Sequence, residues 1–151
     1  MTTDYKLPLP VVHPDNAGFW AALKDHELRL QRCTDCNTLR YPVSPVCHQC
    51  LSYNAEWALL SGKGTLGSWI IVEQATGNPA WQTAVPYVVA LVNLAEGPRI
   101  TCNIEGLEYE QYDQLRYGMP LEVVFDDVTP QITLPKFRPA FRPAPGGKIR
   151  G

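Results

Sequence analysis

Four cysteines in two C-x-x-C pairs constrain this chain more than any other feature of its sequence. Cys33 and Cys36 form the first pair, and after ten further residues Cys47 and Cys50 form the second. Each pair suits a tight turn that points both sulfurs at one place, and four thiolates match the tetrahedral preference of Zn²⁺. Because four protein ligands leave no coordination position open, the pattern predicts a structural zinc ribbon rather than a catalytic zinc.

Other uses of the same cysteines are weighed against zinc. A rubredoxin-type or [2Fe–2S] iron site would take similar ligands. Two disulfides are disfavoured, because the sequence shows no signal peptide and Cys102 is a fifth, unpaired cysteine. His48 lies inside the second pair and would have to displace a cysteine to bind the metal, so we expect it to face solvent. Zinc remains the favoured ligand.

Composition limits the class of protein. The 151 residues are 45% hydrophobic and 19% charged, enough to bury the core of one ordinary domain or two very small ones. The net charge of −2 argues against a dedicated nucleic-acid binder. The sequence shows no export leader and no apolar run long enough to span a membrane. We therefore expect a cytoplasmic protein without a membrane partner.

The first part of the chain predicts an arm, a helix and the ribbon. Residues 1–27 combine a proline-containing extended arm with a short helix over residues 16–25, for which Asp15 is a suitable N-cap. Phe19 and Trp20 are adjacent on that helix, so either both pack locally or one faces a partner. Residues 28–57 form the predicted zinc ribbon, whose folding depends on its metal.

The pattern after the ribbon is that of β-strands, followed by a basic tail. Five strands with a long connection before the fourth fit a closed barrel of the OB type over residues 58–138, although a half-open sandwich would give the same pattern. The predicted fold is mainly β: an N-terminal helix and rubredoxin-like zinc ribbon, then a five-stranded OB-fold barrel. The expected strands are residues 65–74, 85–94, 99–104, 121–125 and 131–134, and the sequence leaves residues 106–118 open as a loop or a short helix.

Neither an apparent nucleotide motif nor a lone thiol supplies a catalytic site. The segment 62–67 matches G-x-G-x-x-G, but the residues that follow are strand-like, whereas a dinucleotide site needs a helix start there. We expect these glycines to let a barrel strand bend. Cys102 lies on the apolar face of its strand and no histidine is near it in sequence, so it reads as a core residue. We predict no catalytic residues.

The order and spacing of several short motifs resemble a known family. The chain is similar to zinc-ribbon/OB-fold proteins that accompany thiolase-like and hydratase-like enzymes acting on acyl-coenzyme A, over residues 8–143. Asn37 stands where the family often has glycine, and both tolerate a left-handed backbone. The matching residues are Phe19-Trp20, the run 28–33 ending in Cys33, Cys36, Tyr41-Pro42, Cys47, Cys50, and the segments 62–66, 118–121 and 134–137.

The resemblance implies an accessory role. Such proteins pair with a thiolase-fold subunit that supplies the catalytic cysteine and histidines, and they stabilise it and help to shape its acyl-CoA entrance. Their settings include steroid side-chain cleavage, benzylsuccinate breakdown and acetoacetyl-CoA handling. On charge alone, Lys63, Arg138 and Arg142 are candidate contacts for CoA phosphates or for acidic patches of the partner.

The basic tail and two other function classes stay open at this point. Residues 139–151 form a proline-rich basic tail that is either solvated or docked on a partner; its wider basic stretch includes Lys136, Lys148 and Arg150, interleaved with Phe137 and Phe141. A single-stranded nucleic-acid binder would also combine an OB barrel with a zinc ribbon. A free-standing enzyme is the third alternative, disfavoured because no catalytic constellation is visible.

Overall fold

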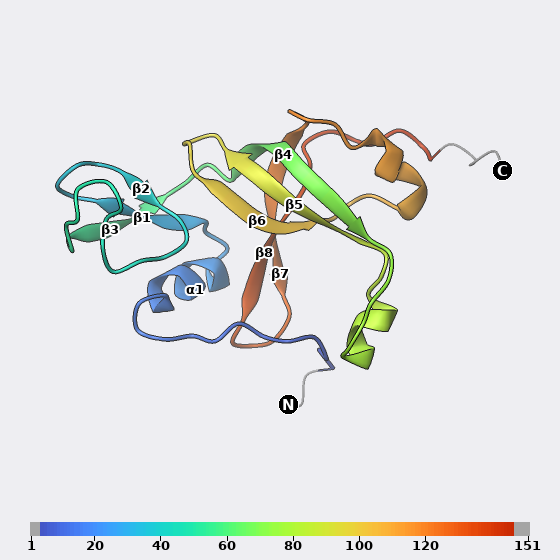
Figure 1. The fold of residues 1–151 in the computed structure, drawn as a ribbon, viewed down its shortest axis with the longest axis horizontal. Coiled ribbons are helices and arrows are strands. Elements are labelled where there is room, and N and C mark those ends of the chain that lie inside the picture. Colours follow the sequence, from blue (N-terminus) through green and yellow to red (C-terminus); the bar gives the residue numbers. More distant parts are fainter. Residues whose placement is uncertain (1–3, 147–151) are drawn as a thin grey trace.

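A small three-stranded sheet lies beside a five-stranded barrel, with a short helix against both, in the computed structural model, which describes residues 4–146 (Figure 1). The predicted fold class is therefore confirmed. Lys148 and Arg150 of the predicted basic tail lie outside the described residues. Within the described residues, no helix is both long and apolar enough to cross a membrane.

Helix α1 spans Ala17–Lys24, close to the predicted range. Asn16, not the expected Asp15, is the N-cap, and its side-chain oxygen accepts a hydrogen bond from the His13 backbone N–H at 2.8 Å. Phe19 is buried and Trp20 is half-buried, and their rings meet edge to face with centroids 5.1 Å apart. Both aromatic residues thus pack locally against the core.

The helix contacts the ribbon through a glycine. A Cβ atom at Gly18 would lie 2.4 Å from the ring of Trp57, so only glycine allows this close approach between α1 and the sheet. The sheet is antiparallel in the order β2-β1-β3, and Leu28 and Leu30 beside and within its central strand are buried. Its strands are β1 (Arg29–Cys33), β2 (Leu39–Arg40) and β3 (Ala55–Leu59).

The barrel closes in the order β4-β5-β6-β8-β7, with β4 returning to pair with β7. Alternate residues of β5 point into it, where Val88, Ala90, Val92 and Leu94 are all buried. The connection left undecided by the sequence contains a short 3₁₀-helix. The elements are β4 (Lys63–Val72), η1 (Pro79–Thr83), β5 (Tyr87–Leu94), β6 (Arg99–Ile104), η2 (Tyr109–Gln114), β7 (Pro120–Asp127) and β8 (Thr133–Pro139).

The last strand runs farther than the sequence suggested. We expected strand 131–134 and then an extended tail from Pro135, but β8 continues to Pro139, and Phe137 is fully buried in the core. Phe137 is therefore not available to dock on a partner. The bond from the Glu105 N–H to the Phe137 carbonyl shows that the backbone groups of odd-numbered β8 residues point towards β6. Strand β8 is bridged to β6 only at Phe137. Pro135 and Pro139 are therefore tolerated, because no ladder bond requires an N–H at these positions.

The glycine-rich segment belongs to a bent strand. The register of β4 against β5 shifts between Leu66 and Ser68, which makes a β-bulge at Gly67. Gly62, just before the strand, has a φ of 74°, a conformation that favours glycine. Because β4 continues through this segment without a helix start, the structure agrees with rejecting a dinucleotide site.

Candidate functional site

The two cysteine pairs fold into the same backbone turn. The Cys33 carbonyl accepts from the Asn37 N–H at 2.9 Å, and the Cys47 carbonyl accepts from the Leu51 N–H at 2.9 Å. Asn37 and Leu51 occupy equivalent positions and both have a φ of 65°. This left-handed residue after the second cysteine of each pair turns the chain back, so that both sulfurs of the pair face one point.

The four sulfurs form a compact cluster. All four Sγ atoms lie within 4.8 Å of one another, and the Cys33–Cys50 and Cys36–Cys47 Sγ pairs are each 3.6 Å apart. Zinc–sulfur bonds of about 2.3 Å in a tetrahedron would place neighbouring sulfurs about 3.8 Å apart, which this cluster fits. A disulfide needs about 2.05 Å, and all five cysteines are free, so the disulfide alternative is wrong. His48 is not part of the cluster.

Two thiols of this cluster have pKa values shifted in opposite directions. Hydrogen bonds with the side chain and backbone of Thr38 lower the pKa of the Cys36 thiol to about 6. A hydrogen bond from the Ser52 backbone lowers the pKa of Cys50, but its hydrogen bonds with the other thiols and its burial together raise that pKa to about 12. Because like charges crowd here, four thiolates need a bound cation, which Zn²⁺ supplies.

Two polar residues brace the cysteine turns. Asp35 accepts hydrogen bonds from the Ser52 hydroxyl and from the Asn54 amide, and so joins the first turn to the second. Arg40 is 1% exposed and donates to the Ser44 carbonyl at 2.9 Å and to the Asn54 carbonyl at 3.0 Å. The sequence did not predict this role of Arg40, because no local pattern separates it from the half-buried Arg29 and Arg32 of the same ribbon.

The predicted basic contact residues gather on one side of the barrel. Lys63 of β4 lies opposite Glu122 of β7, and Glu122 in turn lies opposite Arg138 of β8. Arg138 Nε donates to Glu122 Oε1 at 2.8 Å. Arg142 lines a cavity of about 300 Å³ together with Arg138 and Glu122. Lys63 and Arg138 therefore flank Glu122 in the sheet register, and Arg142 lines the adjoining cavity, so three basic residues and one carboxylate share this part of the surface.

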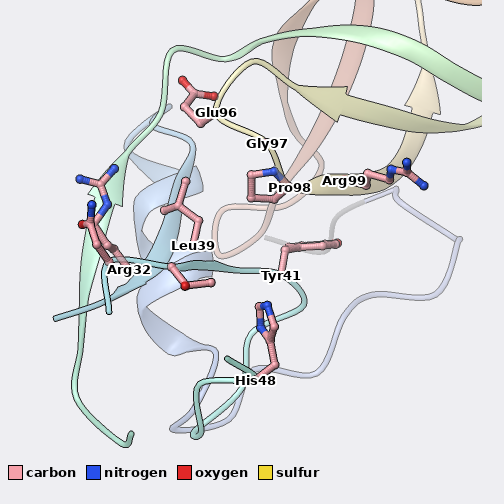
Figure 2. Close-up of a pocket in the computed structure, with 10 residues that line it drawn as sticks. Arg32, Leu39, Tyr41, His48, Glu96, Gly97, Pro98 and Arg99 are labelled. Carbon is pink, nitrogen blue, oxygen red and sulfur yellow. The ribbon is translucent and has the colours of Figure 1, made fainter. Parts of the chain in front are cut away.

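A larger cavity separates the ribbon from the turn between β5 and β6. It has a volume of about 700 Å³, and Tyr41, His48 and Pro98 line it together with two arginines. The guanidinium groups of Arg32 and Arg99 lie at opposite ends of this cavity (Figure 2). They do not converge on a common point, so this cavity lacks the clustered donors of an anion site.

The fifth cysteine is a poor nucleophile. Cys102 is partly buried on β6 and lines a cavity of about 230 Å³ with Trp20 and Tyr41. Burial raises the pKa of its thiol to about 12. Since the thiolate is the reactive form, Cys102 is almost entirely protonated at neutral pH.

Two family models match adjacent parts of the chain. Residues 20–54 match the rubredoxin-like zinc ribbon domain of ChsH2, and residues 57–126 match the C-terminal OB-fold domain of ChsH2. These ranges coincide with the cysteine ribbon and with most of the barrel. The cysteine cluster therefore lies in a domain of a zinc-binding family, which favours zinc over the iron alternative.

The chain is also similar to curated proteins. The chain is 38% identical over 133 residues to a probable enoyl-CoA hydratase alpha subunit of Thermomonospora curvata. This match covers 88% of the present chain and 40% of that protein. It is 30% identical over 104 residues to a DUF35 domain-containing scaffold protein of Methanothermobacter thermautotrophicus, covering 68% and 74%. The chain spans less than half the length of the curated hydratase subunits that it matches.

A solved structure shares the fold along its full length. A chain of the structure described as "Ltp2-ChsH2(DUF35) aldolase" superposes with a TM-score of 0.78 at 38% identity. The match covers 88% of the present chain and 100% of that chain. With both family models and this full-length match, the chain belongs to the ChsH2/DUF35 family, in which a rubredoxin-like zinc ribbon precedes an OB-fold domain.

Proposed function

We propose that this chain is a non-catalytic, zinc-binding subunit of a complex that processes acyl-CoA thioesters, paired with a thiolase-like protein. The partner supplies the reaction, which is that of a thiolase, an aldolase or an acyltransferase. The present chain stabilises the partner and contributes to the surface that receives CoA.

One observation carries this proposal. The similar chain in the Ltp2–ChsH2(DUF35) aldolase structure is matched over 100% of its length. Every part of that solved chain therefore has a counterpart in the present chain. Names of relatives point the same way, since one is a scaffold protein and another is an alpha subunit of an enoyl-CoA hydratase. These names describe parts of assemblies, and the hydratase name adds a CoA thioester as substrate.

The chemistry of the described residues supports an accessory role. Four thiolates complete the shell of the predicted zinc, so a substrate has no coordination position to enter. Cys102 holds its proton at neutral pH because burial raises its pKa to about 12. Neither sulfur site is therefore suited to activating a substrate, and catalysis is assigned to the partner.

The basic surface gives the CoA role a physical basis. Lys63 and Arg138 neighbour Glu122 across the sheet and Arg142 lines the same cavity as Glu122, so three basic residues stand against one acidic residue there. Phosphate groups of CoA, or an acidic patch of the partner, would be attracted to this excess. Arg138 already binds Glu122, so we assign the larger share of the attraction to Lys63 and Arg142.

The nucleic-acid alternative loses support from the ion pairs of β8. Lys136 contacts both Glu105 and Asp126, and Arg138 contacts Glu122. These pairs neutralise the cations of β8 that the sequence offered for phosphate contacts. Binding of single strands by an OB fold needs a basic groove with aromatic residues that stack on bases, and the one buried aromatic residue of β8, Phe137, is not accessible.

Co-purification tests the proposal. The tagged chain is expressed in its native host, and bound proteins and metal are measured on the same sample. We expect one zinc per chain and a thiolase-like protein bound in a fixed ratio. The thermal midpoint and the acyl-CoA turnover of that thiolase-like protein should both fall when the present chain is removed. A zinc-loaded monomer that leaves the activity and stability of that protein unchanged would refute the proposal.

Charge-removing variants then test the CoA surface. We expect Lys63→Gln and Arg142→Gln to raise KM for the CoA thioester while assembly is preserved. Arg99→Gln is the matched control, because Arg99 is an exposed arginine of the same barrel on a different cavity. An unchanged KM in both test variants would remove CoA from the proposal and leave only the structural role.

A further inference from the structure

Strand β4 is paired along its whole length on one side only. Its register with β5 runs from Gly64 to Val72, whereas its register with β7 covers only Lys63 to Thr65. Pairing on the β7 side ends at the bond from the Gly118 N–H to the Leu66 carbonyl. Among the strands of residues 4–146, none is paired with that side of the segment Ser68–Val72, which we call the free edge.

The sequence of the free edge lacks the usual protection against pairing. Exposed edge strands in stable proteins are commonly very short, or they carry charged residues or proline. The three-stranded sheet follows this rule, because β2 has two residues and β3 carries Glu56. The free edge instead reads Ser-Trp-Ile-Ile-Val, with no charge, no proline and three β-branched residues. Such a segment favours addition of another strand.

The backbone groups that face outward can be identified. The bond from the Leu94 N–H to the Pro98 carbonyl shows that even-numbered residues of β5 point their backbone groups towards β6. The odd-numbered residues Tyr87 and Val89 therefore face β4, where they lie opposite Val72 and Ile70. Because backbone groups alternate along a strand, the N–H and C=O groups of Trp69 and Ile71 point to the free edge.

Apolar side chains accompany these groups. Ile70 is 62% exposed and Ile71 is 38% exposed. Tyr117, immediately before the residue where pairing with β7 ends, is 78% exposed. The free edge thus offers a row of hydrogen-bonding groups flanked by large apolar surface, which an extended peptide segment matches in both respects.

We propose that an extended segment of the thiolase-like partner pairs with the free edge and adds a strand to the β4–β5 sheet. This inference rests on the proposed function. A second copy of this chain is a weaker occupant, since stable interfaces use about 20–30 residues a side and self-pairing here uses five. The partner is also expected at Lys63, which begins the same strand.

Hydrogen exchange on the zinc-loaded chain gives a direct test. The probe is the purified thiolase-like protein recovered by the co-purification described above. On complex formation we expect the amides of Trp69 and Ile71 to exchange at least about tenfold more slowly, as ordered main-chain bonds require. The amides of Ile70 and Val72 already bond to β5 and should change less. Unchanged exchange at Trp69 and Ile71 in a formed complex would overturn the inference.

A pair of variants at one position separates the main-chain bond from the side chain. Ile71→Pro removes the outward N–H, and Ile71→Thr keeps it together with β-branching. We expect the Kd for the partner to rise about tenfold or more with proline and about threefold or less with threonine. Equal effects would overturn the inference. If the proline variant does not fold, as judged by circular dichroism and zinc content, the exchange result decides.

The outcomes separate this inference from the proposed function. Failure of the wild-type chain to bind the partner refutes both. Binding without protection of the free edge refutes only the inference. Protection that appears in the chain alone, rising with concentration and with a dimer mass, would overturn it in favour of a second copy.

Discussion

The ribbon and the barrel are held together by different means. Of the six buried residues from Leu28 to Leu60, three are leucines at the junction with the common core, and the other three are Cys33, Cys47 and Arg40. The barrel instead buries apolar residues from all five of its strands and from the segment before β7. The ribbon therefore depends on a metal and a few polar contacts, whereas the barrel depends on buried apolar area.

Metal removal should break this comparison most strongly. Structural zinc in small ribbons and fingers contributes an apparent binding free energy of about 10–16 kcal/mol, so a ribbon without its metal has little to keep it folded. We expect Cys47→Ser, or chelation of the wild type, to unfold residues 29–59 while the barrel stays folded. Hydrogen exchange should show amides of β1 and β3 losing protection and those of β5 and β6 keeping it.

The matched control for metal loss is the cysteine outside the cluster. Cys102→Ser should keep one zinc per chain and a protected ribbon, because Cys102 is not among the four clustered sulfurs. A ribbon that stays protected in the zinc-free Cys47→Ser chain would show that side-chain packing alone folds it, and the contrast with the barrel would fail.

The barrel should respond most to loss of an aromatic ring in its core. Phe137 is fully buried, so Phe137→Ala should lower the free energy of unfolding by about 3–5 kcal/mol. Phe141, four residues later, is 48% exposed, and Phe141→Ala should change the same quantity by less than about 0.5 kcal/mol. Urea unfolding of zinc-loaded samples measures both, and similar values would contradict the assignment of Phe137 to the core.

The contact between the helix end and the barrel should give a smaller, pH-dependent effect. His26 stacks on Phe125 at a centroid distance of 5.2 Å, and its Nε2 lies 2.9 Å from Asp127 Oδ2. The pKa of Asp127 lies below its usual value, first because the Thr133 hydroxyl donates to it and then because of His26. A lowered carboxyl pKa stabilises the fold above the unfolded-state value and loses this effect as pH falls through the folded-state value.

Asp127→Asn should therefore lower Tm by a few degrees at pH 6 and by progressively less as the pH falls below about 4, where the unfolded carboxyl takes up its proton. Asp15→Asn is the control, and its Tm difference from the wild type should be small at every pH. A Tm difference for Asp127→Asn that grows on acidification would contradict the sign derived from the lowered pKa.

Local sequence patterns predicted most of the fold, because the metal ligands and most strands are specified by residues that are close in sequence. The spacing of the four cysteines specified the cluster, and β-rich apolar runs together with period-two alternation located the five barrel strands. The end of β8 was missed, because prolines normally exclude a strand. Their tolerance at Pro135 and Pro139 depends on which side of β8 faces a neighbour, and that is a tertiary property.

The functional residues were predicted less completely for the same reason. The gathering of Lys63 and Arg138 around Glu122 requires three strands to lie side by side, which no local pattern specifies. Burial of Arg40 depends on carbonyl groups of Ser44 and Asn54, which lie on either side of the second cysteine pair. The free edge of β4 reads as an ordinary strand in sequence, and only the barrel order shows that half of it lacks a neighbour.

The smallest predicted effect compares the two cysteine turns with each other. Asn37 and Leu51 share a φ of 65°. Asparagine adopts this left-handed conformation at little energetic cost, whereas leucine adopts it only with backbone strain. Leu51 is 73% exposed, so its side chain returns little packing energy for that strain. Leu51→Gly should therefore raise the free energy of unfolding of the zinc-loaded chain by about 0.5 kcal/mol, since relief of about 1–2 kcal/mol is partly offset by the entropy of glycine. Asn37→Gly should leave it within about 0.3 kcal/mol, as expected for a residue already suited to the turn. A loss of stability in Leu51→Gly, measured by chemical unfolding at saturating zinc, would mean that the leucine side chain stabilises the second turn through contacts that outweigh its backbone strain.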